Sequence, residues 1–88
     1  PVAKGVIGDS FAQLEQYDEA LSYYLQAADL SNNALTTPRY LLKAGTTALR
    51  LGQNGLALKA FTRILDEFED ATEATQAKAY KAQAEAAQ

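Results

Sequence analysis

The chain has 88 residues, which suits one compact domain over residues 1–88, and 48% of its residues are apolar, too many for an intrinsically disordered segment. Eight Lys and Arg residues against eleven Asp and Glu residues give a net charge of -3, which argues against nucleic acid or an anionic membrane as a partner. Cys and His are absent, so the usual ligands for zinc, haem and iron–sulfur clusters are missing, and neither a metal nor a cofactor is expected.

Ala, Leu, Gln, Glu and Lys dominate the chain, whereas Pro occurs twice and Gly five times, a composition typical of an all-α fold. No apolar run approaches the ~20 residues of a membrane-spanning helix, so membrane insertion by this segment is not expected. The chain begins at Pro1 without an initiator methionine, which suggests a processed protein or a piece of a longer one. Apolar residues recur at helical spacing in five stretches, which predict helices at about 2–15, 18–30, 38–51, 55–68 and 71–86.

Polar residues at the expected helix starts give physical reasons for these boundaries. Thr37 is suited to cap the third helix with Pro38 in its first turn, and Asn54 is suited to cap the fourth. Residues 70–73 resemble a capping box for the fifth helix, with Asp70 as the cap. The connections after the first and third helices are very short, which predicts antiparallel helix hairpins joined by a longer loop.

The two expected hairpins share an internal repeat. When the sequence is aligned with itself at a shift of 37 positions, small residues align with small residues and one aromatic residue aligns with another. The pattern predicts close helix contacts at the small residues, with the rings filling the space between hairpins, as in a solenoid. The matching pairs are Gly8 and Gly45, Ala20 and Ala57, and Tyr24 and Phe61.

These small residues and rings resemble the tetratricopeptide repeat (TPR). The first unit carries the pattern at Ile7, Gly8, Phe11, residues 17–21, Tyr24 and Ala27, and the second at Leu41, Ala44, Gly45, Gly52, Ala57, Leu58 and Phe61. The spacing of 37 exceeds the 34 of the family, which an insertion in the central loop explains. The resemblance implies a right-handed superhelix of two hairpins, at about 2–30 and 38–68, and a C-terminal capping helix at about 71–86.

A second resemblance concerns the end of the chain. Residues 61–74, followed by an Ala-rich stretch, are similar to the ends of bacterial envelope TPR domains, of the type found in the Tol-Pal-associated cell-division coordinator and the translocon ancillary protein. In those domains an aromatic-Pro-Asp-Ser turn leads to the last helix, whereas here residues 68–71 lack the proline. This resemblance implies a location in the bacterial periplasm or cell envelope.

Basic residues are separated from acidic ones in the second half of the chain. Residues 37–65 contain five Lys and Arg residues and no acid. At about 100° per residue, Arg39, Lys43, Thr46 and Arg50 fall within one sector of the third helix, opposite its apolar side. The stripe is either a solvated face or a binding surface.

The TPR resemblance implies the second interpretation, because the first helix of each unit lines a concave groove in that family. On this basis the groove is expected to bind a protein or peptide, of acidic character, through cations and neighbouring leucines. The family's clamp for C-terminal carboxylates places Lys and Asn where this chain has Gly5 and Asp9, so that clamp is not expected. The expected groove residues are Asp9, Gln13, Arg39, Leu42, Lys43, Thr46, Leu49 and Arg50.

Catalysis is not expected from this sequence. Residues 8–10 are similar to the nucleophile block of GDSL hydrolases, but the chain has no His to accept the proton of Ser10. The acids between Asp66 and Glu73 match no calcium loop. The predicted function is therefore a non-catalytic protein-interaction scaffold. The alternatives are a structural module that stacks on further repeats or on a second copy, and an accessory domain of a longer protein.

Overall fold

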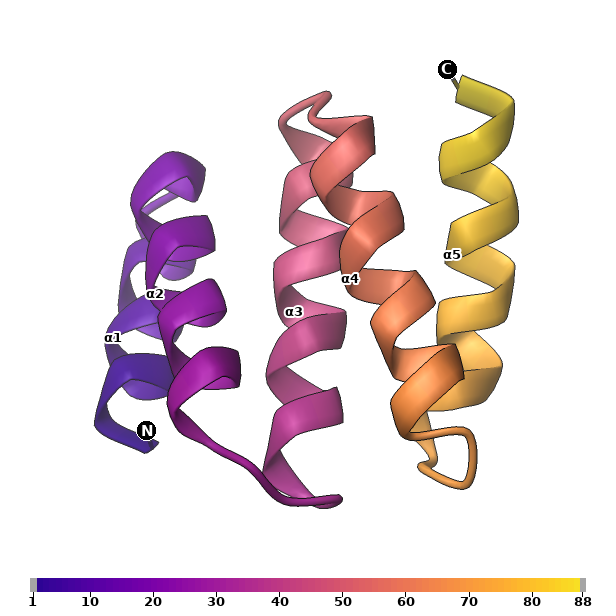
Figure 1. Cartoon of the computed structure of the whole chain (residues 1–88). Helices are drawn as coiled ribbons and strands as arrows, with labels where there is room; N and C mark the ends of the chain where they lie inside the picture. Colours follow the sequence, from indigo (N-terminus) through magenta and orange to yellow (C-terminus); the bar gives the residue numbers. More distant parts are fainter. Residues whose placement is uncertain (1, 88) are drawn as a thin grey trace.

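The computed structural model describes residues 2–87 and confirms the all-α prediction. Across these residues the chain forms five helices, each antiparallel to the next (Figure 1), and the globule measures 28 × 28 × 16 Å. All helix ends lie within two residues of the predicted ones. The helices are α1 (Val2–Gln13), α2 (Tyr17–Leu30), α3 (Thr36–Arg50), α4 (Asn54–Glu67) and α5 (Glu73–Ala87).

The helices form two layers. Helix α1 contacts α3 through an ion pair between Asp9 and Lys43, and α3 also contacts α5. On the other side Arg63 of α4 faces Asp29 of α2, so α2 and α4 make up the second layer, which lies in front of α1 and α3 in Figure 1. This layering places α1, α3 and α5 side by side on one face of the molecule. None of the helices over residues 2–87 is long and apolar enough to cross a membrane.

The core repeats the same contact in both hairpins. Tyr24 packs on Gly8, and Phe61 packs on Gly45, so closely that a Cβ atom on either glycine would overlap the ring. Ala20 and Ala57 are fully buried beside them. The predicted close contacts at the four small residues are therefore confirmed, because only small side chains let helix backbones approach this closely around a ring.

The two hairpin turns are also equivalent. The amide of Gln16 donates to the carbonyl of Phe11 at 2.9 Å, and the amide of Gln53 donates to that of Ala48 at 2.8 Å, 37 residues further along in both cases. Each turn has one residue in the left-handed region, Glu15 with φ 59° and Gly52 with φ 75°. Such six-residue closures end a helix and reverse the chain.

Three predicted caps differ in the structure. Helix α3 begins at Thr36, and the side chain of Asn33 accepts hydrogen bonds from the amides of Leu35 and Thr36, at 3.0 and 2.6 Å. Thr37 is instead buried, where its hydroxyl shares a hydrogen bond with Ser31. The other two caps fail because the helices start elsewhere: Asn54 is the first residue of α4 and makes no cap, and α5 starts at Glu73, too far from Asp70.

Candidate functional site

A shallow groove lies between α3 and α5 on the three-helix face. It has a volume of about 420 Å³, and one wall consists of the predicted residues Arg39, Leu42 and Lys43. The other wall is formed by Thr72, which directly precedes α5, and by Glu73 and Gln76 at the start of α5. This wall could not be predicted from the sequence. Helix α4 connects α3 to α5 and packs against both, and this packing brings α3 and α5 into contact.

The structure brings the predicted residues Asp9 and Lys43 together across the α1–α3 boundary. The Lys43 Nζ atom donates to Asp9 Oδ1 at 2.8 Å, and the Tyr24 hydroxyl donates to the same oxygen at 2.5 Å. The Lys43 ammonium also lies 5.7 Å from the ring centre of Tyr24 and 5.9 Å from that of Tyr40. Lys43 is thus held by a carboxylate and two rings, and its charge is largely neutralised within the protein.

The pKa values in this network follow from its geometry. Burial raises the pKa of Asp9, but the hydrogen bonds from Lys43 and Tyr24 and the charge of Lys43 outweigh it, so the pKa lies below the usual 3.8. Burial and the hydrogen bond to Asp9 raise the pKa of Tyr24 well above its usual 10.0. Asp9 therefore stays ionised and Tyr24 stays a donor near neutral pH.

Arg39 and Arg50 remain available on the same helix. Among the described residues, ion pairs involve Lys43 and Arg63 of the basic segment, and neither Arg39 nor Arg50 has an acidic partner. Both arginines are exposed, and the Arg50 guanidinium lies 4.7 Å from the ring centre of Tyr17 at the start of α2. Tyr17 orients Arg50 without neutralising it, because the contact leaves the guanidinium hydrogen-bond donors free.

The remaining predicted residues take different roles. Leu42 and Leu49 are half-buried, with one side packed on the core, and so contribute partly exposed apolar surface. Thr46 is also half-buried, and its hydroxyl donates to the carbonyl of Leu42 at 3.1 Å. Gln13 is the exposed last residue of α1. Gly5, which the TPR resemblance would place in a groove, is buried against the ring of Tyr40 and offers no binding surface.

The described residues contain no grouping of three acidic side chains suited to hold a metal. The Ser10 hydroxyl lies within α1 and donates to the carbonyl of Val6 at 3.2 Å, as a structural serine in a helix does. Comparison of the chain with protein-family models, curated proteins and solved structures found no match. The side chains that line the groove offer charge pairing and apolar contact.

Proposed function

We propose that this chain is a non-catalytic protein-interaction module of TPR-like superhelical form, and that it binds an acidic peptide segment along the exposed face of α3. The observation that carries the proposal is the state of Arg39 and Arg50, which are exposed and lack an acidic partner among the described residues. The partly exposed Leu42 and Leu49 lie between them in sequence on the same side of α3. A location in the bacterial envelope remains an expectation of sequence resemblance alone.

The spacing of the two arginines specifies the length of the peptide segment that can contact both. They are eleven positions apart on α3, which corresponds to about 16 Å along the helix axis. An extended peptide covers this distance in about five residues. Guanidinium groups bind carboxylates through two parallel hydrogen bonds. A segment with acidic residues at both ends and apolar residues between them therefore complements this face.

Binding can be tested by fluorescence anisotropy with a labelled peptide that carries two aspartates separated by four residues, two of them leucine. We expect the double variant Arg39→Glu/Arg50→Glu to weaken binding at least tenfold, since it replaces attraction by repulsion at both contacts. Raising the salt concentration should weaken binding of the wild-type protein in the same direction. Circular dichroism should show an unchanged helix content, because both residues are exposed.

The matched control is Lys59→Glu on α4 in the other layer. It reverses an exposed cation that forms no ion pair within the described part of the chain, and it should leave binding within about twofold. Equal binding of the peptide by wild-type protein and by the folded double arginine variant would exclude this face of α3 as the binding site. Equal binding of a peptide in which both aspartates are replaced by asparagine would remove the acidic ligand.

A further inference from the structure

The groove between α3 and α5 carries opposite charges on its two walls. Three of its six lining residues are charged: Arg39 and Lys43 on the α3 wall, and Glu73 on the α5 wall. Lys43 is already paired with Asp9, whereas Arg39 and Glu73 form no ion pair within residues 2–87, either with each other or with another side chain. The groove therefore offers a ligand one cation and one anion, and an acidic ligand residue satisfies only the cation.

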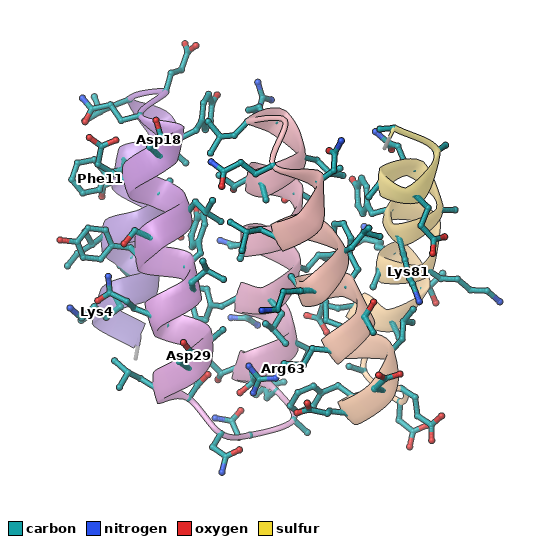
Figure 2. All side chains as sticks on the ribbon, turned by 45° about the horizontal axis from the view of Figure 1, so that its top comes forward. Lys4, Phe11, Asp18, Asp29, Arg63 and Lys81 are labelled. Carbon is teal, nitrogen blue, oxygen red and sulfur yellow. The ribbon has the colours of Figure 1, made fainter. Side chains whose placement is uncertain are left out.

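The other charged residues of α5 do not change this balance. Lys78, Lys81 and Glu85 do not line the groove, and none of them pairs with Glu73. Figure 2 shows Lys81 at the side of the molecule furthest from α1. Glu73 is thus the only acid that lines the groove in the part of the chain that the structure describes.

The carboxylate of Glu73 keeps most of its capacity to accept hydrogen bonds. Glu73 is the first residue of α5 and is half-buried. The Thr72 hydroxyl donates to Glu73 Oε1 at 3.2 Å, and no other residue that the structure describes donates a hydrogen bond to this carboxylate. Because a carboxylate has about four acceptor positions, a ligand cation can still bind there.

Glu73 and Arg39 lie at the same end of the groove. Arg39 is the fourth residue of α3 and Glu73 the first of α5, and the two helices run in the same direction because α4 reverses the chain twice between them (Figure 1). Arg50 ends α3 at the other end of the helix. An acid therefore faces the ligand near Arg39, opposite the wall on which Arg39 lies.

An extended peptide in the groove addresses both walls. Its successive side chains point to opposite sides. When an acidic residue of the peptide points towards Arg39 on α3, the next residue points towards α5, where Glu73 lies. A lysine or arginine at that position is attracted by Glu73, whereas a second acid is repelled.

We propose that Glu73 is a specificity-determining residue, and that the groove prefers a segment in which a lysine or arginine directly adjoins the acid held by Arg39. This inference rests on the proposed function, because it concerns the same groove and the same class of ligand. It narrows the ligand from an acidic segment to one in which an acid and a base alternate at the Arg39 end. A run of acids would satisfy Arg39 but would place its second carboxylate against Glu73.

Fluorescence anisotropy with two labelled peptides tests the preference. One peptide has the sequence Asp-Lys-Leu-Leu-Lys-Asp and the other Asp-Ala-Leu-Leu-Ala-Asp, so that a lysine adjoins the aspartate at Arg39 whichever way the first peptide runs. Glu73→Gln should weaken binding of the lysine peptide about three- to fivefold, the size expected for a partly exposed ion pair, and should change binding of the alanine peptide less than about twofold. Glu73→Lys should weaken binding of the lysine peptide at least tenfold, because repulsion replaces attraction.

The matched control is Glu69→Gln, which removes an exposed acid of the preceding loop that lines a different hollow and should change binding of either peptide less than about twofold. Glu73 also lies at the positive end of the α5 dipole, where an acid stabilises a helix without any ligand. A loss of that stabilisation would affect both peptides alike, so the difference between the peptides separates recognition from a structural role.

Two outcomes overturn the inference alone. They are equal weakening of both peptides by folded Glu73→Gln, and no weakening of either, in each case with binding that Arg39→Glu/Arg50→Glu still reduces at least tenfold. If the folded double arginine variant binds both peptides like wild type, or wild type binds neither up to about 1 mM, the proposed function fails and this inference fails with it. Circular dichroism establishes that each variant is folded.

Discussion

Asp9 connects three helices through a single carboxylate oxygen. It lies on α1, accepts hydrogen bonds from Lys43 of α3 and Tyr24 of α2, and is about 41% exposed. Two donors on one oxygen explain why the pKa of Asp9 falls despite partial burial. The same contact removes Lys43 from the set of cations open to a ligand, so a residue predicted to bind a partner is instead part of the contact between hairpins.

A lowered pKa makes this contact dependent on pH in a defined direction. Because the carboxyl group binds protons less readily in the folded than in the unfolded protein, its stabilising effect is fully present above the unfolded value near 3.8 and is lost as pH falls through the lower folded value. Asp9→Asn should therefore lower the Tm at pH 7, and the difference from wild type should shrink as pH falls below 3.8. Thermal melts by circular dichroism measure this. The control is Asp18→Asn, at an exposed residue that forms no ion pair with any residue the structure describes. A difference for Asp9→Asn that is constant from pH 7 to below 3.8 would contradict the assignment.

Each hairpin combines one glycine with one ring and one left-handed turn residue. Helices α1 and α2 meet at Gly8 and Tyr24, and helices α3 and α4 meet at Gly45 and Phe61. The equivalent turn bonds fix the same reversal of direction after α1 and after α3. The repeat of 37 residues is therefore a repeat of packing as well as of sequence letters.

The glycine contact predicts opposite outcomes for two substitutions in the second hairpin. Gly45→Ala places a methyl group against the buried ring of Phe61 and should destabilise the fold by about 1 to 3 kcal/mol. Gly55→Ala lies in α4 with open space around the new atom, so it should stabilise by about 0.5 to 1 kcal/mol through the reduced entropy of the unfolded chain. Urea denaturation measures both. If the two variants shift the midpoint in the same direction, the close contact at Gly45 is not as described.

Tertiary contacts in the whole molecule are mostly between consecutive helices. Each helix packs on the next, and the further contact of α3 with α5 closes the groove. In such arrangements every internal element is stabilised by neighbours on both sides, whereas terminal elements have one neighbour. Helix α5 matters in this respect because its Tyr80 stacks on Phe61 of α4, which is fully buried.

Removal of α5 should therefore affect the whole protein. Truncation after Asp70 uncovers the side of α4 that α5 packs against, including the ring of Phe61. Fully burying a side chain of the size of Phe or Ile contributes about 1.5 to 3 kcal/mol, a large share of the stability of a domain this small. We expect the truncated chain to lose cooperative thermal unfolding and to self-associate, as measured by circular dichroism and light scattering. An unchanged, cooperative transition would show that α5 is dispensable for the fold.

Helix number, approximate helix ends and the paired small and large residues of the two hairpins could be predicted from the sequence. They depend on spacing along one helix, as in the series Arg39, Lys43, Thr46 and Arg50, or on a repeat visible in the chain itself. The capping residues were predicted less well. Asn33 was missed because Thr37 and Pro38 match the usual pattern of a helix start equally well in sequence, and only the folded loop shows Thr37 buried beside Ser31.

The basic stripe of α3 follows from the order of its residues alone, whereas the packing of the five helices settles which of its cations form ion pairs. Lys43 forms an ion pair with Asp9, 34 positions away in the sequence, whereas Arg39 and Arg50 have no acidic partner among residues 2–87. The second wall of the groove, at Glu73 and Gln76, was decided in the same way. The physical reason is that helical periodicity is a property of neighbouring residues, while ion pairing and groove formation depend on distances between side chains of different helices.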